Sequence, residues 1–572
     1  MTRCPSPGLP TFSSSATSSS ALRGLTSLAV LAALAACGGG GSSDSPPAPA
    51  PPPVAVAPPP PAALTVGGTA ATGAAMAAAA VQIKCVGGNG TATTGADGVY
   101  SVAITGASLP CVLSVSSGST TLRSVAEAGT ATTVTANISP LSEIIAAHLA
   151  GGNAAALFTT FDAAAQAKLT SAGLTAARTA VGNALQGAVD LTGIDPIKDV
   201  LTIGNPLDKK LDALGAALKA GGVSVADVVA ALAANPAAPA VVQTLLQPAA
   251  TSCAALRSGN YRAIDPGNLL SPFGRVKIDA VGLSFTNSGG TAYAMTPSTT
   301  DGACVFTLNS GIARAYVSRG GLVLLRYAPP GEPVGVALLV PEQTVPIAEA
   351  LGNWNMGYYG AATFNGPDGS SYNTLTFDVA GKLTAGADCE GISACVPWTP
   401  LATDVLVAQA DGGFKHSSPD GTSARFFVVK SAAGAIASFG IRSDAQGRPL
   451  GVLFGSKANV LTLPAVGEVT RFWDLSFTST GPGTVVDSQV TVKTVDTAAL
   501  SYTRERLADG RIDSFTLNKP QPGMRYRAAG TGGNVSYGAV VAAPLAGMGL
   551  TVTASVNQGT ASSFFNVSVL KP

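Results

Sequence analysis

The chain has 572 residues, which is long enough for several domains. Its 33 basic and 32 acidic side chains leave a formal net charge of +1, and only 11% of the residues are charged. This balance gives no support for a nucleic-acid partner or for a strongly acidic one. After residue 36 no apolar run reaches about 18 residues, so we expect no membrane anchor beyond the N-terminal segment.

The first 36 residues have the layout of a secretory signal, with basic residues ahead of a short apolar core from Leu25 to Ala36. The end of this core, Leu34-Ala35-Ala36-Cys37, resembles the lipobox of bacterial lipoproteins. The resemblance implies that the signal is cut before Cys37 and that Cys37 is diacylated. It also implies that Gly38, which follows the cysteine, favours the outer membrane. The alternative is an ordinary signal peptide with an incidental cysteine.

Residues 37–63 have the composition of a tether. Gly38 to Gly41 are flexible, and the proline-rich stretch from Pro46 to Pro61 favours polyproline II, which spans about 50 Å at about 3.1 Å per residue. We therefore expect a lipid-anchored outer-membrane protein, on the periplasmic or the cell-surface face. The stalk would hold its folded body away from the bilayer.

Eight cysteines are present, of which Cys4 lies in the predicted signal and Cys37 in the lipobox. The other six belong to an exported, oxidising setting and allow 15 pairings. They fall as local pairs in separate segments, so three disulfides are the economical interpretation: Cys85 with Cys111, Cys253 with Cys304, and Cys389 with Cys395. None belongs to a CxxC motif and the chain has two histidines, so we expect no metal site and no cofactor.

Residues 64–138 alternate apolar and polar side chains between Gly/Thr turns, which predicts an antiparallel β-sandwich. Within this segment the sequence from Thr94 to Tyr100, TGADGVY, resembles the T-x-x-D-G-x-Y signature of carboxypeptidase regulatory-like domains, which are small transthyretin-like sandwiches. The resemblance implies that Asp97-Gly98 makes a hairpin turn and that Tyr100 enters the core. It implies a spacer or interaction module rather than an active site.

Residues 139–250 change to helical periodicity and are rich in alanine. Ser139-Pro140 and Asn205-Pro206 each place a capping residue before a proline, which predicts that helices begin there. Further helices are expected over Val223–Leu232 and Ala238–Leu246. His148 falls on the apolar stripe of the first helix, where we expect a core or edge residue rather than a catalytic one.

From residue 251 onward strand patterns return in three tandem units, over residues 251–347, 348–468 and 469–572. Gly259-Asn260-Tyr261 in the first unit returns as Gly352-Asn353-Trp354 in the second. Three further motifs repeat in the same order: Val276–Leu283 as Leu375–Lys382 and more weakly as Thr494–Ala498, Phe306–Asn309 as Phe515–Asn518, and Gly331–Val336 as Gly447–Val452. The chain is thus predicted to be multidomain and mainly β. We expect the units to be lipocalin-like barrels or curved antiparallel sheets, with a propeller-like arrangement as the alternative.

Signals for catalysis are weak. No nucleophile elbow, Walker loop, zinc-protease or dinucleotide motif is present. His416 lies near Ser417, Ser418 and Asp420, but the stretch has the composition of a turn. We therefore predict that the chain is not an enzyme. The alternative is a hydrolase of envelope polymers with His416 as its base.

Aromatic residues are the best sequence candidates for a binding site, because the chain is only 6% aromatic and several gather at the start of the second unit. The candidates are Trp354, Tyr358, Tyr359 and Tyr372, with Trp354 expected in the core. Five arginines of the third unit could meet anionic glycans, although alternation along exposed strand faces explains them more simply: Arg504, Arg506, Arg511, Arg525 and Arg527. We expect a non-catalytic lipoprotein that binds a glycan, an apolar ligand or an envelope protein. A purely architectural envelope protein is the other alternative.

Overall fold

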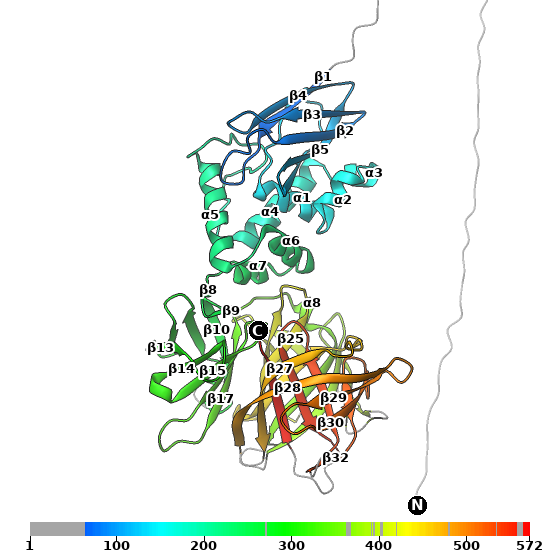
Figure 1. The fold of residues 1–572 in the computed structure, drawn as a ribbon. Helices are drawn as coiled ribbons and strands as arrows, with labels where there is room; N and C mark the ends of the chain where they lie inside the picture. The colour runs from blue at the N-terminus through cyan, green and yellow to red at the C-terminus, as the bar shows by residue number, and fades with distance from the viewer. Residues whose placement is uncertain are drawn as a thin grey trace, which may run out of the picture. The chain divides into compact units, whose positions relative to one another are not determined.

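A computed structural model describes residues 63–572, with gaps at 269–270, 362–367, 390–391, 393–394, 401–403, 419, 479–480, 533–534 and 557–563. The predicted signal, Cys37 and nearly all of the Gly/Pro stalk therefore lie outside the described residues. The described part belongs to one compact unit, Pro61–Pro572. It is multidomain and mainly β, as the sequence predicts (Figure 1).

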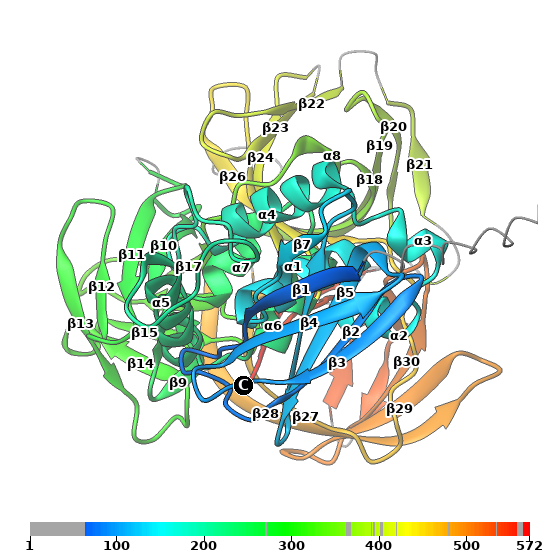
Figure 2. The same cartoon turned by 90° about the horizontal axis from the view of Figure 1, so that it is seen from above.

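The first domain is a sandwich of two sheets (blue in Figure 2). One sheet contains β1 (Ala63–Thr69), β4 (Val99–Thr105) and β7 (Thr133–Thr135), and the other contains β2 (Ala80–Val86), β3 (Gly88–Thr93), β5 (Ser108–Ser117) and β6 (Thr120–Ala126). Most neighbours are antiparallel, but β7 pairs with β1 in parallel. The expectation of a fully antiparallel sandwich is wrong in that one pairing.

The turn around Asp97 differs from the expected hairpin. Asp97 accepts the backbone N–H of Val99 at 3.0 Å, and Tyr100 is buried and donates its hydroxyl to the Ala136 carbonyl. The strands on either side of this turn, β3 and β4, belong to different sheets. The turn therefore carries the chain from one sheet to the other, while the core position of Tyr100 is as predicted.

The helical domain follows, and two of its helices begin at the predicted caps, Ser139-Pro140 and Asn205-Pro206. The helices are α1 (Pro140–Ala150), α2 (Ala154–Thr159), α3 (Ala163–Gln166), α4 (Ser171–Leu185), α5 (Pro206–Gly221), α6 (Val225–Ala234) and α7 (Pro239–Leu245). Ser139 and Ser142 form a reciprocal capping box at α1, and Asn205 accepts the N–H of Asp208 at 2.8 Å at α5. The apolar stripes of these helices join the sandwich residues in one hydrophobic cluster.

The first β unit is a closed barrel that follows a short pair, β8 (Ala249–Ala250) and β9 (Cys253–Arg257). We call it the first barrel. Its strands, in order around the barrel, are β10 (Gly259–Ile264), β11 (Arg275–Asp279), β12 (Ser284–Thr286), β13 (Ala292–Pro297), β14 (Val305–Leu308), β15 (Ala313–Val317), β16 (Val323–Tyr327) and β17 (Gly335–Pro341). This up-and-down order satisfies the backbone of every strand through its two neighbours.

The second β unit is a curved nine-stranded sheet, which we call the open sheet (Figure 2). It follows the short helix α8 (Ile347–Ala350). Its strands are β18 (Gly352–Ala361), β19 (Asp368–Phe377), β20 (Leu383–Asp388), β21 (Val396–Trp398), β22 (Val405–Ala408), β23 (Phe414–Ser417), β24 (Ser423–Lys430), β25 (Ile436–Ser443) and β26 (Pro449–Lys457). A single bridge between Lys382 and Val405 links its two ends.

The third β unit is again a closed barrel, which we call the C-terminal barrel (orange to red in Figure 1). Its strands are β27 (Val469–Thr478), β28 (Gly481–Asp496), β29 (Ser501–Arg506), β30 (Ile512–Leu517), β31 (Arg525–Arg527), β34 (Val540–Leu545), β35 (Leu550–Ser555) and β36 (Phe564–Leu570). A separate ribbon contains β32 (Gly530–Gly532) and β33 (Val535–Tyr537). Barrels and a curved sheet are thus present, and the propeller alternative is wrong.

The repeated Gly-Asn-aromatic motif begins the first strand of two units. Gly259 and Gly352 both have positive φ, of 146° and 86°, a conformation that favours glycine. The aromatic side chain that follows each glycine is buried and donates to the carbonyl four residues upstream: Tyr261 to Arg257 at 2.9 Å, and Trp354 to Ala350 at 2.7 Å. The motif therefore anchors the strand to the segment that enters its unit.

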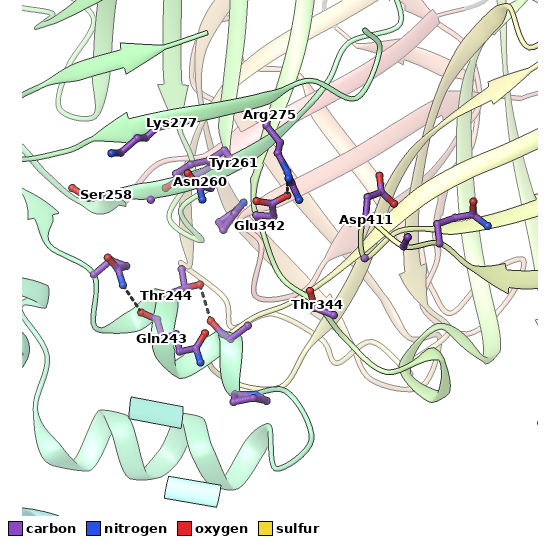
Figure 3. Close-up of a pocket in the computed structure, with 18 residues that line it drawn as sticks. Gln243, Thr244, Ser258, Asn260, Tyr261, Arg275, Lys277, Glu342, Thr344 and Asp411 are labelled. Atoms are coloured by element: carbon purple, nitrogen blue, oxygen red, sulfur yellow. Dashed lines mark hydrogen bonds and ion pairs between the residues drawn. The ribbon is translucent and has the colours of Figure 1, made fainter. Parts of the chain in front are cut away.

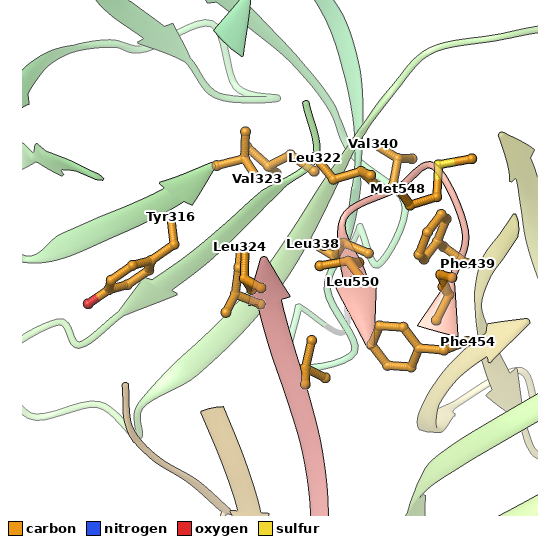
Figure 4. Close-up of a cluster of buried hydrophobic side chains, with 14 of the residues drawn as sticks. Tyr316, Leu322, Val323, Leu324, Leu338, Val340, Phe439, Phe454, Met548 and Leu550 are labelled. Atoms are coloured by element: carbon orange, nitrogen blue, oxygen red, sulfur yellow. The ribbon is translucent and has the colours of Figure 1, made fainter. Parts of the chain in front are cut away.

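One hydrophobic cluster is shared by all three β units. In Figure 4 it includes Tyr316, Leu324 and Leu338 of the first barrel, Phe439 and Phe454 of the open sheet, and Met548 and Leu550 of the C-terminal barrel. The C-terminal barrel contributes the outward side chains of its strands, such as Trp473 of β27 and Phe565 of β36. Its outer wall is consequently apolar on the side that packs against the other units.

The six cysteines form three disulfides: Cys85–Cys111, Cys253–Cys304 and Cys389–Cys395. They close loops of 26, 51 and 6 residues in the sandwich, the first barrel and the open sheet respectively.

No single helix of the described residues has the length and apolar character to cross a bilayer. Among these residues only α5 and α6 meet the same criteria as a pair, and the two helices are bent by 85° relative to each other.

Candidate functional site

The four aromatic candidates from the sequence are buried rather than displayed. Trp354 is 2% exposed, Tyr372 1%, Tyr358 8% and Tyr359 9%. They lie on β18 and β19, in the middle of the open sheet, and their polar atoms are used internally; Tyr359, for example, donates to the Thr478 carbonyl at 2.6 Å. The burial of Trp354 in the core is as expected, whereas Tyr358, Tyr359 and Tyr372 do not form an exposed aromatic platform, because they pack in the core as well.

Of these four residues, Tyr359 does border a cavity. An apolar cavity of about 270 Å³ lies where the first barrel, the open sheet and the C-terminal barrel meet. Tyr359, Leu338, Phe454 and Phe477 line it, and the Tyr359 hydroxyl lies 3.1 Å from Asp368. The cavity borders the shared hydrophobic cluster, and residues of all three β units line it.

His416 lies on β23, inside the curve of the open sheet. Its Nε2 is 3.7 Å from Oδ1 of Asp404, and its ring meets the edge of Phe377. Burial lowers the pKa of His416, while the Asp404 carboxylate acts in the opposite direction. A histidine and a carboxylate are two members of a hydrolytic set, but their surroundings are the core of the sheet, where a packing role suffices.

The largest polar hollow lies between α7 and the first barrel (Figure 3). It has a volume of about 830 Å³, and Arg275, Lys277, Glu342 and Asp411 are charged residues on its wall. Arg275 donates to Glu342 at 2.7 Å, as the dashed line in Figure 3 marks. The carboxylate of Asp411 is likewise paired, with Arg425. Two basic and two acidic residues thus line the hollow, so its wall carries no net formal charge.

The lumen of the C-terminal barrel is different, because its polar side chains point inward. On β29 the inward positions are Tyr502, Arg504 and Arg506, and on β31 they are Arg525 and Arg527. Tyr526, between the last two, faces outward into the shared cluster. The interpretation of these arginines as exposed strand faces is wrong: the alternation is real, but the arginine face is the inside of the barrel.

An inward cavity of about 390 Å³ occupies one end of this lumen. Among the described residues its charged lining is four arginines and one carboxylate: Arg504, Arg506, Arg511, Arg527 and Asp474. Side chains with hydroxyl or amide groups complete the polar part: Ser476, Ser488, Thr553, Ser555, Asn566 and Ser568. The rest of the wall is mainly aromatic and aliphatic: Phe472, Val486, Phe515, Tyr537, Gly538, Val540, Val556 and Phe564. This volume lies in the range of small-molecule sites.

Asp513 lies beneath the arginines and holds three of them. Arg527 Nη1 donates to its Oδ1 at 3.0 Å, Arg511 Nη2 donates to its Oδ2 at 3.2 Å, and Arg504 Nη2 is 3.6 Å from Oδ2. The Asp513 side chain is 1% exposed. Burial acts to raise its pKa, but the charges of Arg527, Arg504 and Arg511 outweigh burial and lower the pKa below its ordinary value.

The cations of the lumen exceed its anions. Burial, followed by the charge of Arg525, lowers the pKa of Arg504 to about 10, so Arg504 is charged at neutral pH. Burial raises the pKa of Asp474 even though Ser568, at 2.7 Å, and nearby Arg506 favour its ionised form. Asp474 therefore offsets the arginines less than an ordinary aspartate would. The lumen has a surplus of positive charge in a low-dielectric setting.

Two of the arginines have spare donors. Arg527 uses both terminal nitrogens, on Asp513 and on the Gly538 carbonyl at 3.0 Å. Arg504 has its 3.6 Å approach to Asp513, and Arg506 has a 4.0 Å approach to Asp509. The Nε atoms of Arg504 and Arg506 are buried without a hydrogen-bond partner in the described part of the chain. The Nε atoms of Arg511 and Arg527 are likewise without a hydrogen-bond partner there, but both of these side chains donate to Asp513 through a terminal nitrogen. Arg504 and Arg506, on one face of β29, make no such hydrogen bond to a described residue, so they are the less engaged arginines of the cavity.

The sequence analysis identifies these arginines but predicts an exposed strand face for them instead of the barrel lumen. The signal that would have placed them is the two-residue period itself: Tyr502 precedes Arg504 by two residues, and Asp513 precedes Phe515 by two. An aromatic and an arginine on one strand face indicate a buried face with a paired charge. In the structure Arg504 lies over the Phe515 ring at 4.7 Å.

Among the described residues, no three His, Cys, Asp or Glu side chains are grouped so that they could hold a metal ion.

The chain matches no described protein family and no curated protein. Among solved structures, a protein of unknown function from the DUF3598 family of Nostoc punctiforme is 9% identical, with a TM-score of 0.16, and the match covers 39% of this chain and 97% of that one. Transferrin binding protein B of serogroup B Neisseria meningitidis is 12% identical over 57% of this chain and 70% of its own, with a TM-score of 0.20. Its counterpart from Haemophilus parasuis, as a mutant, has 9% identity over 52% and 60%, with a TM-score of 0.17. Likeness at this level carries no argument about function.

Proposed function

We propose that the chain is a lipid-anchored, non-catalytic binding protein of the outer membrane, and that the lumen of its C-terminal barrel is the binding site. The lipobox at Cys37 and the proline-rich stalk support the anchored location. The observation that carries the binding role is the polar cavity of about 390 Å³ inside a barrel whose outer wall is apolar. An interior that only packed would instead be filled with apolar side chains.

The barrel suits binding rather than catalysis. Its strands fix the inward side chains from both sides, so a ligand would meet groups that are already positioned, which lowers the entropic cost of binding. One side of the outer wall packs against the other units, whereas the lumen holds a polar cavity with room for a ligand. The sandwich, which resembles carboxypeptidase regulatory-like domains, would act as a spacer next to the stalk.

Ligand-observed NMR with a mixed library of neutral, cationic and anionic small molecules tests this proposal. The matched variant is Ser488→Phe, which adds a large side chain at a buried position on the cavity wall. We expect compounds that bind the wild-type protein to lose their signals with this variant while its melting curve stays cooperative. Equal signals from both proteins, or none from either, would refute the lumen as the binding site.

A further inference from the structure

We propose that the ligand of the C-terminal barrel is a small hydroxylated organic acid of the sugar-acid class, with its carboxylate on Arg504 and Arg506. This inference rests on the proposed function and names the chemistry of the same cavity. It is carried by the less engaged guanidinium groups, by the ring of hydroxyl and amide side chains, and by the position of Asp474.

The arginine pair selects an anion. Arg504 and Arg506 project from the same face of β29, two residues apart, and neither is bound closely by a carboxylate: the approaches are 3.6 Å to Asp513 and 4.0 Å to Asp509. Guanidinium groups offer parallel N–H donors that match a planar carboxylate in a bidentate arrangement. An anion between them would receive donors that the described residues leave unused.

The rest of the wall selects hydroxyl groups rather than an alkyl chain. Ser568, Asn566 and Ser476 form a chain of hydrogen bonds on the inner face of β36 and β27, in which Asn566 donates to Ser476 at 3.0 Å. Asp474, which accepts from Ser568, adds an acceptor with further lone pairs. Alcohol groups of a ligand can both donate to Asp474 and accept from the neighbouring side chains. A fatty acid would place its alkyl chain against these polar groups and could neither donate to Asp474 nor accept from the neighbouring side chains along that chain, so it gains less from this wall than a hydroxylated acid does.

The aromatic rings complete the fit. Tyr537 lies over the guanidiniums of Arg527 and Arg511, at 4.4 and 5.1 Å, and so stiffens the positively charged end of the cavity. Phe472 and Phe564 present flat apolar surface to the remaining space. Such surface suits the C–H face of a sugar ring, while its polar edge meets the hydroxyl side chains.

Isothermal titration of the full-length processed protein in detergent tests the inference with three probes: sodium glucuronate, glucose as its neutral match, and sodium octanoate as an apolar acid. We expect glucuronate to bind about tenfold or more tightly than either of the other two, because a charged hydrogen bond contributes about 1.5 to 3 kcal/mol. This comparison needs no variant.

Arg506→Gln should weaken glucuronate binding about tenfold, and Arg506→Lys should weaken it less, because lysine keeps the charge but loses the paired donors. The matched control is Arg471→Gln on the outer surface of the same barrel, where Arg471 is exposed and donates to Gln489. This control removes the same charge from the protein but should leave the affinity unchanged.

Tighter binding of octanoate than of glucuronate, or an unchanged affinity in Arg506→Gln, would overturn the inference. If none of the three probes binds while other library compounds lose their signals with Ser488→Phe, the sugar-acid class is wrong and the proposed function stands. If no compound binds in either experiment, both the sugar-acid inference and the proposed binding function are wrong.

Discussion

Asp513 is the residue on which the inward arginines of the C-terminal barrel converge. Three guanidiniums lie within 3.6 Å of its carboxylate, and its side chain is 1% exposed. Buried charges of this kind are tolerated only while they are paired, because removing one partner leaves the others uncompensated in a low-dielectric interior. The polar lumen therefore depends on Asp513 to compensate the charges of these arginines.

Asp513→Asn should destabilise the protein by about 3 to 5 kcal/mol, since it leaves Arg527, Arg511 and Arg504 without their shared counter-ion. Chemical denaturation followed by tryptophan fluorescence measures this loss, because Trp473 lies on the outer wall of the same barrel. The control is Asp509→Asn, whose 4.0 Å pair with Arg506 is partly exposed; its cost should stay within about 1 kcal/mol. Equal losses in the two variants would contradict the central role of Asp513.

We expect the free energy of unfolding to depend on pH because of His416. Because burial lowers its pKa in the folded state, the folded protein disfavours the protonated form. The corresponding stability is present above the ordinary histidine value of about 6.5 and is lost as the pH falls through that value toward the lower, folded-state pKa. We expect the free energy of unfolding to fall between pH 7.5 and pH 5, and to fall less in His416→Gln. Parallel pH profiles for the two proteins would show that His416 does not contribute.

At the scale of elements, the sequence predicts local structure where one side chain decides it. Three repeats of the same aspartate turn illustrate this. Asp279 and Asp496 end the second strand of their units, and Asp378 directly follows the second strand of its unit. Each accepts two backbone N–H groups of the following turn, for example those of Val281 and Gly282. The helix caps at Ser139 and Asn205 are predictable for the same reason.

Other repeats mislead because similar strands occupy different places. The Phe306–Asn309 motif lies on the fifth strand of the first barrel, whereas Phe515–Asn518 lies on the fourth strand of the C-terminal barrel. Both end in an asparagine with positive φ, so the likeness reports a shared turn and not an equivalent strand. Closure of a barrel depends on pairing between its first and last strands, which local sequence does not encode. The inward face of β29 is a different case, because the two-residue spacing of Tyr502 and Arg504 already indicates a buried face.

The disulfides give a prediction at this scale. Cys253–Cys304 closes a loop of 51 residues in the first barrel, whereas Cys389–Cys395 closes only 6. The entropy removed from the unfolded chain grows with the logarithm of loop length, so replacing the first pair with alanine should cost about 2 kcal/mol more than replacing the second. Denaturant midpoints of the two double variants measure the difference. The opposite order would mean that contacts around β21, and not loop closure, dominate.

At the scale of the whole molecule, we expect membrane anchoring through Cys37 to be independent of the folding of the domains. Cys37→Ala removes the proposed lipid site, and two or more acyl chains are what gives stable membrane attachment. The variant should therefore leave the membrane fraction or keep an uncleaved signal, while its sandwich and barrels fold unchanged. Fractionation and mass spectrometry of the N-terminus measure both. Normal processing with unchanged detergent partitioning would refute the lipoprotein assignment.

The first barrel and the C-terminal barrel meet at a seam of direct backbone contacts. Ser318 Oγ donates to the Met548 carbonyl at 2.8 Å, and the N–H of Arg319 donates to the Leu570 carbonyl at 2.9 Å. Gly320, next in the chain, lies so close that an added Cβ would meet the Met548 carbonyl carbon at 2.4 Å. The first and C-terminal barrels therefore touch backbone to backbone, where neither side has a flexible side chain that could yield.

Gly320→Ala should force this seam apart and cost about 1 to 3 kcal/mol, the usual range for overpacking. Its matched control is Gly369→Ala, at a strand position where an added Cβ meets nothing within 4 Å. Because the first barrel covers part of the apolar outer wall of the C-terminal barrel, the Gly320 variant should also bind more of a hydrophobic dye than wild type, which the control should not. Unchanged dye binding and stability in Gly320→Ala would mean that the first barrel and the C-terminal barrel do not pack against each other in solution.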